Sequence, residues 1–146
     1  MKTHILTKAI GALLVPLTAL AVAAEPTQEP TLKEIMQSLR DDVFTIADGM
    51  FTDDMDRIAQ GASGIAHHPS IPGKQVQRVA AELGPEMQAF KQLDIRVHDL
   101  SMSIISAAKT QDRERISADF QQLINGCLAC HTSYKERVAN ALKDPK

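Results

Sequence analysis

One apolar stripe near the C-terminal end constrains the fold more than any other feature of this 146-residue chain. Within residues 112–142, apolar side chains recur at steps of three and four, which is the period of one face of an α-helix. The stripe consists of Ile116, Phe120, Leu123, Cys127, Cys130, Tyr134, Val138 and Leu142. The pattern predicts one long amphipathic helix that buries this face.

Three further segments show the same helical period. The first covers residues 32–50, and Thr31 with Glu34 fits a capping box at its start. The second is expected to begin near residues 52–53 and to end before Pro69, because a proline disfavours helical geometry in the residue that precedes it. The third fits residues 94–109. All four helices present one apolar face and one polar face.

Residues 67–93 form the least regular stretch, with a short helix expected only at residues 75–83. Its prolines and glycines are Pro69, Pro72, Gly73, Gly84 and Pro85. Almost nothing in the chain has the alternating pattern of a strand. Four amphipathic helices in a chain of this length predict an all-α, up-down-up-down four-helix bundle that occupies residues 31–142.

The first 24 residues have the layout of a secretory signal peptide. A basic start is followed by an apolar run at residues 9–21, and small residues precede Glu25. The run is shorter than the ~20 residues that a spanning helix needs, although an uncleaved N-terminal anchor is the alternative. We expect cleavage to leave a periplasmic protein without a membrane span, in which residues 25–30 form a flexible tail.

The composition excludes several classes of protein. With 44% apolar and 23% charged residues, the chain is too apolar and too balanced in charge to be disordered. A net charge of −2 argues against a nucleic-acid partner, and two cysteines are too few for a disulfide scaffold. Only 3% of the residues are aromatic, so part of the core is open to another bulky group. The motifs of serine hydrolases, phosphate loops and zinc proteases are missing, and we expect no enzymatic activity.

The residues with specific chemistry are Cys127, Cys130 and His131, within the sequence Cys-Leu-Ala-Cys-His. C-x-x-C-H is the attachment signal for a c-type haem. Positions i, i+3 and i+4 share one face of a helix, so both sulfurs and the imidazole point in the same direction. A redox disulfide, half of a zinc site, and two buried cysteines beside a chance histidine are the alternatives. The first is expected near a βαβ pattern, and the second needs another ligand cluster.

An exported four-helix pattern with a single Cys127-x-x-Cys130-His131 near its end resembles the class II c-type cytochromes, which include cytochrome c′. The resemblance implies one covalent haem c, with Cys127 and Cys130 as thioethers and His131 as the proximal iron ligand. It implies a one-electron carrier with redox partner proteins in the periplasm. Members of this family often form homodimers through their first two helices.

The second axial position of the iron has several candidate ligands. In an up-down bundle, the start of the first helix lies beside the end of the last one, so Met36, His67, His68 and His98 all lie toward the haem end. Met36 matches the family's distal position, and its alternative role is packing against the porphyrin. The three histidines fit surface or helix-end positions better. With Met36 bound, the protein is an electron carrier; without it, a five-coordinate, cytochrome c′-like protein that binds nitric oxide.

Overall fold

The computed structural model describes residues 29–143 of the chain, and within them all regular structure is helical. The expected signal peptide, residues 1–24, and most of the expected tail lie outside the described residues. The helices are α1 (Leu32–Thr52), α2 (Met55–Ala66), α3 (Gly73–Leu83), the short 3₁₀ turn η1 (Gly84–Glu86), α4 (Met87–Lys109) and α5 (Arg113–Ala141). None of these helices is long and apolar enough to cross a membrane.

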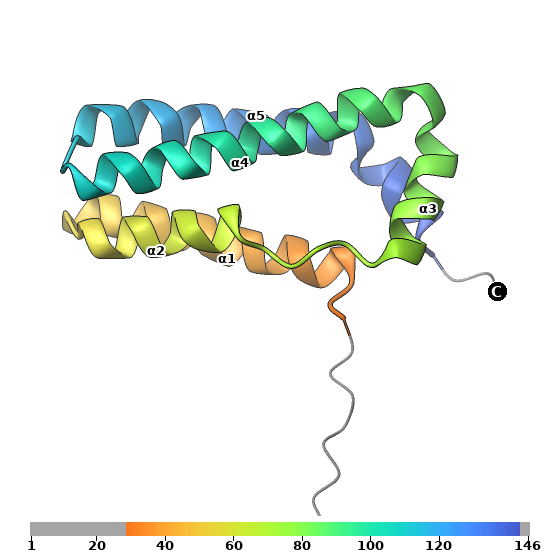
Figure 1. The fold of residues 1–146 in the computed structure, drawn as a ribbon, viewed down its shortest axis with the longest axis horizontal. Helices are drawn as coiled ribbons and strands as arrows, with labels where there is room; N and C mark the ends of the chain where they lie inside the picture. Colours follow the sequence, from red (N-terminus) through yellow and green to blue (C-terminus); the bar gives the residue numbers. More distant parts are fainter. Residues whose placement is uncertain (1–28, 144–146) are drawn as a thin grey trace, which may run out of the picture.

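Four of the helices pack side by side in antiparallel contacts, as the sequence predicts. α1 packs against α2, α2 against α4, and α4 against α5, whereas α1 and α5 do not pack closely on each other. Figure 1 shows α1 and α2 as one layer, α4 and α5 as the other, and α3 across one end. The predicted all-α class and the antiparallel packing of four helices are therefore confirmed.

The ends of the first two helices follow local signals in the sequence. At the start of α1, the Glu34 carboxylate accepts a hydrogen bond from the Thr31 backbone N–H at 2.7 Å, and the Thr31 hydroxyl oxygen accepts one from the Glu34 N–H at 3.3 Å. This is the predicted capping box. α2 begins after Asp54, whose carboxylate accepts from the Arg57 N–H, and it ends at Ala66, before Pro69.

The start of α4 corrects the sequence-based expectation. The helix begins at Met87 instead of residue 94, directly after η1. Pro85 lies in the first turn of η1, where a missing N–H costs no hydrogen bond, so the proline starts a helical segment instead of ending one. Met87, Phe90 and Leu93 then follow at steps of three and pack against buried residues at the α3 end of the molecule.

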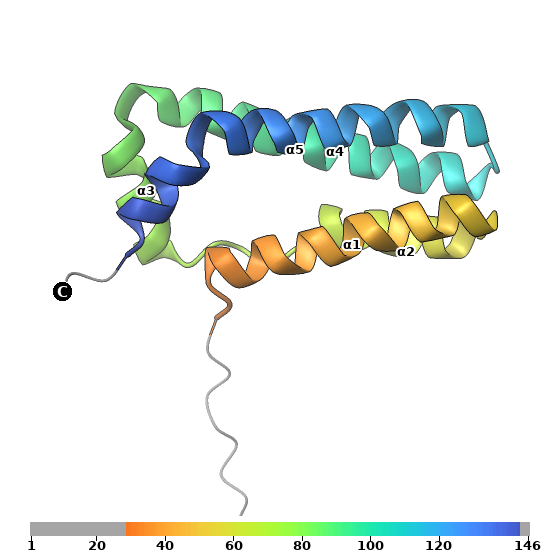
Figure 2. The same cartoon turned by 180° about the vertical axis from the view of Figure 1, so that it is seen from behind.

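The core is divided into two clusters. The main cluster lies between α1, α2, α4 and α5, and consists of Ile46, Ile58, Ala62, Ile65, Ile104, Ala107, Ala108, Ile116 and Leu123. The end cluster joins the start of α1, α3 and the end of α5, and consists of Leu32, Val79, Leu83, Tyr134 and Val138. The last turns of α5 bend to run beside α3 (Figure 2). The start of α1 thus lies beside the end of α5, as the antiparallel topology predicts.

Glycines on α1 and α2 bring these two helices into close contact. A Cβ atom on Gly61 would lie 2.6 Å from the Asp42 carbonyl oxygen and 2.8 Å from the Ile46 backbone nitrogen. Both are main-chain atoms of α1, which cannot move aside as a flexible side chain can. Gly61 therefore sets the distance between the two helices.

We expect Gly61→Ala to separate α1 from α2 and to lower the free energy of unfolding by about 1–3 kcal/mol, the range for overpacked cores. Thermal and urea denaturation followed by circular dichroism measures this loss. The matched control is Gly73→Ala at the start of α3, where a Cβ atom would meet nothing within 4 Å. The control is expected to change the stability by less than about 1 kcal/mol. Equal stability of the two variants would contradict the close contact.

Candidate functional site

α5 carries Cys127 at its midpoint, and Cys130 and His131 follow one helical turn later. Both cysteines are free and half-buried. Cys127 packs against the main cluster, and Cys130 packs against the end cluster. The two thiols, which are one helical turn apart, therefore lie on opposite sides of the boundary between the two parts of the core.

The surroundings of the two thiols favour their neutral form. Burial raises the pKa of Cys127. Burial also raises the pKa of Cys130, and the negative charge of Asp94 adds to this effect. The cysteines of thiol–disulfide enzymes have lowered pKa values, because the thiolate is their nucleophile. The environment of Cys127 and Cys130 thus gives no support to the redox-disulfide alternative.

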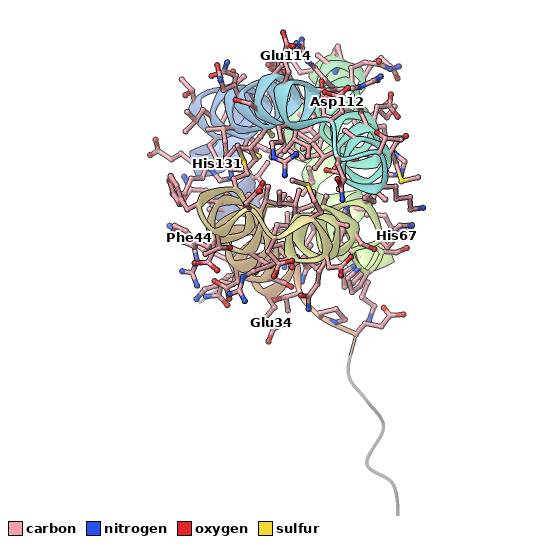
Figure 3. The ribbon with its side chains drawn as sticks, turned by 90° about the vertical axis from the view of Figure 1, so that its left-hand side faces the viewer. Glu34, Phe44, His67, Asp112, Glu114 and His131 are labelled. Atoms are coloured by element: carbon pink, nitrogen blue, oxygen red, sulfur yellow. The ribbon has the colours of Figure 1, made fainter. Side chains whose placement is uncertain are left out.

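His131 is exposed, although other residues on the same side of α5 are wholly or partly buried. Ile124 and Val138, each seven residues away, are half-buried and buried, respectively. α4 covers the other flank of α5, where Val97 lies close to Gly126. The imidazole of His131 therefore lies on the flank of α5 that faces α1, where the two helices do not pack closely. Figure 3 shows His131 on the same side of the molecule as Phe44 of α1.

Apolar side chains of α1 and α5 are exposed on this α1/α5 flank. Met36 is 39% exposed, and Leu128, which follows Cys127 directly, is 58% exposed. The helical period of residues 32–50 counts Met36 among the apolar residues of one helix face, and in the structure it lies at the edge of that face. Leu32 and Ile35, which precede Met36 on α1, are buried, so Met36 is the first exposed apolar side chain along this helix. Met36 thus lies toward the end of the bundle that carries the motif by topology, and at the surface by exposure.

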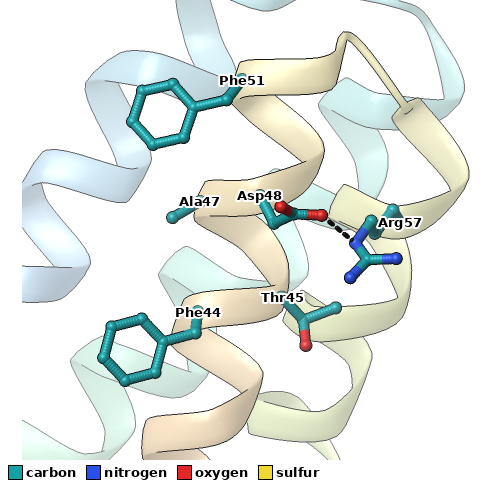
Figure 4. A pocket seen from close by; sticks show the side chains of 6 residues that line it. All are labelled: Phe44, Thr45, Ala47, Asp48, Phe51 and Arg57. Atoms are coloured by element: carbon teal, nitrogen blue, oxygen red, sulfur yellow. Dashed lines mark ion pairs between the residues drawn. The ribbon is translucent and has the colours of Figure 1, made fainter.

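Farther along α1, Phe44 and Phe51 are 64% and 90% exposed. They line a shallow pocket of about 420 Å³ together with Ala47 and Asp48 of α1 and Arg57 of α2. Figure 4 shows both rings projecting from α1 away from Arg57, whose guanidinium pairs with Asp48 at 2.6 Å. No motif in the sequence marks these two rings, although their spacing of seven residues places them on one face of α1.

The other histidines make short-range contacts. The His67 Nδ1 atom lies 3.0 Å from the Ser63 carbonyl oxygen, and the His68 Nδ1 atom lies 2.8 Å from the Pro69 carbonyl oxygen. His98 is exposed and lies 3.4 Å from the Asp99 carboxylate. Within residues 29–143, no group of three or more histidine, cysteine or acidic side chains could hold a metal ion. The second ligand cluster that a zinc site needs is therefore missing from the described part of the chain.

The C-terminal part of α5 is held in place by Arg137, a role that the sequence does not reveal. Its guanidinium lies 2.8 Å from a Glu86 carboxylate oxygen and 3.3 Å from one of Glu82. These partners are far from Arg137 in the sequence, so no local pattern marks them. The contact ties α5 to α3 and η1, next to the motif.

Comparisons with known proteins leave the site to be interpreted from its own residues. No protein-family model matches the chain, and neither a curated protein nor a solved structure matches it at a significant level.

Proposed function

We propose that this protein is a periplasmic, mono-haem c-type cytochrome that carries one electron between larger proteins. The thiols of Cys127 and Cys130 would hold haem c as thioethers, and His131 would be the proximal ligand of the iron. The observation that carries the proposal is the placement of C-x-x-C-H on α5, with two half-buried thiols and an open imidazole at the boundary between the two core clusters.

The residues around the motif fit a bulky apolar group attached at this place. Each thiol can add its S–H bond across one vinyl group, which forms a C–S and a C–H bond and needs no oxidant. The low aromatic content, the division of the core and the poorly packed α1/α5 flank leave an apolar surface that a porphyrin would cover. When bound in this way, a haem supplies reversible one-electron exchange and cannot dissociate.

Met36 is the residue that separates two forms of this function. As a thioether ligand, it would close the second axial position and raise the reduction potential, which suits an electron carrier. The alternative is a five-coordinate, cytochrome c′-like protein that binds nitric oxide. The 39% exposure of Met36 is compatible with both forms, because an axial ligand and a side chain that only packs on the porphyrin would both be covered by the haem itself.

The partners that we propose are redox proteins of the periplasm and a second copy of the chain. The exposed pair Phe44 and Phe51 supports the homodimer. Exposed apolar patches on soluble proteins mark interaction sites, and two large rings seven residues apart make one such patch on α1. A two-fold axis near Ala47 would place Phe44 of one copy against Phe51 of the other.

The first test of this function is covalent attachment. The protein produced in a host with a cytochrome maturation system should carry the added mass of one haem, and this mass should survive acid–acetone extraction. Cys127→Ala and Cys130→Ala together should abolish it, while Met36→Ala should retain it. A wild-type protein of unmodified mass with two free thiols would contradict the proposal.

The role of Met36 is tested by spectroscopy of the ferric protein. If Met36 binds the iron, the wild type should be low-spin and show the weak long-wavelength band of sulfur-to-iron charge transfer. Met36→Leu retains the packing but removes the ligand, so it should give high-spin iron and a lower potential. Met102→Leu, which changes an exposed methionine of α4, should have no effect. A high-spin wild type that binds carbon monoxide and nitric oxide would favour the five-coordinate form.

The homodimer is tested by analytical ultracentrifugation over a range of concentrations. Phe51→Glu should weaken self-association about 30-fold or more, since a central interface residue contributes about 2 kcal/mol or more. The matched control is Ile95→Glu, because Ile95 is an exposed apolar residue on α4, away from the patch. A wild type that remains monomeric at all concentrations, or a control that dissociates the dimer equally, would contradict the α1 interface.

A further inference from the structure

The end cluster is attached to the rest of the molecule less extensively than the four long helices are to one another. α3 packs on the end of α5 and only slightly on α4. A hydrogen bond of 2.8 Å from the Leu32 N–H to the Gln75 side-chain oxygen joins α3 to the start of α1. The ion pairs of Arg137 with Glu82 and Glu86 are exposed, and such pairs contribute little to stability.

The two clusters also differ in how completely they are buried. In the main cluster, to which four helices contribute, Ile46, Ile104 and Leu123 are fully buried. In the end cluster, Leu32, Tyr134 and Val138 retain contact with solvent. Parts of a protein with fewer buried apolar contacts open locally at a lower free energy than global unfolding requires. The end cluster has fewer buried apolar contacts than the main cluster, so we expect it to open locally at a lower free energy.

Cys127 and Cys130 are covered by different clusters. Loss of the end cluster would uncover Cys130, which packs against it, while Cys127 would remain packed on the main cluster. We infer that the end cluster opens as a unit separate from the main cluster, and that this opening makes Cys130 accessible to a bulky electrophile before Cys127. The two thiols then react in a fixed order. This order applies to the chain with free thiols, whichever group reacts with them.

The test compares two single-cysteine variants of the full chain, produced without haem. Cys127→Ser leaves only Cys130, and Cys130→Ser leaves only Cys127. Alkylation by a bulky maleimide is followed by mass spectrometry under native conditions, and each rate is divided by the rate of the same variant in high urea. We expect the normalised rate of Cys130 to exceed that of Cys127 at least about tenfold. The rate of Cys130 should also rise with urea less steeply than global unfolding does.

Two further substitutions assign the opening to the end cluster. Leu83→Ala removes buried contacts of α3 and should accelerate alkylation of Cys130 at least about tenfold, with Cys127 unchanged within about twofold. Val79→Ala is the milder variant in case Leu83→Ala does not fold. The matched control is Ile104→Val in the main cluster, which should accelerate alkylation of Cys127 more than that of Cys130. Equal normalised rates, or equal acceleration of both thiols by Leu83→Ala, would overturn the inference. A chain that fails to bind haem would leave it intact.

Discussion

Burial of the apolar stripe of α5 is the interaction on which the rest of this structure depends. α5 has 29 residues and α4, on which it packs, has 23, so α5 is about 44 Å long and α4 about 35 Å. The helices that form the main cluster therefore cannot cover α5 along its whole length. α3, lying across the end of the molecule, covers the remaining turns, and the last part of α5 bends to meet it. Two clusters form because two different sets of helices bury one stripe.

Polar contacts connect α5 to the other helices without being the main source of stability. At its start, Arg113 makes two hydrogen bonds of 2.7 Å to the Asp53 carboxylate in the turn between α1 and α2. Farther along, the Ser103 hydroxyl of α4 donates to Asp119 at 2.6 Å. Near its end, Arg137 contacts Glu82 and Glu86. Most of these groups are exposed, so they fix the position of α5 more than they hold the molecule together.

The position of C-x-x-C-H gives the two cysteines different surroundings. A motif on a fully covered helix would present two equivalent buried thiols. Here one thiol packs on each cluster, and His131 lies on a flank that α1 leaves uncovered. This arrangement supports attachment of one apolar group at the boundary. A different cluster of apolar side chains also buries each cysteine, which is the basis for the different reactivities inferred above.

The sequence by itself determined the features that depend on neighbouring residues. The helical period predicted α1, α2 and α5, the capping box of Thr31 and Glu34 was correct, and the motif gave its three candidate residues. The sequence placed the start of α4 too late, because Gly84 and Pro85 suggest a break when the contacts of Met87, Phe90 and Leu93 are unknown. It gave no sign of the divided core, the Arg137 contacts, or the exposure of Met36, Phe44 and Phe51. Those features were decided by the tertiary structure, because the burial of a side chain depends on which distant helix covers it, and α1 and α5 do not pack closely enough to cover each other's flank.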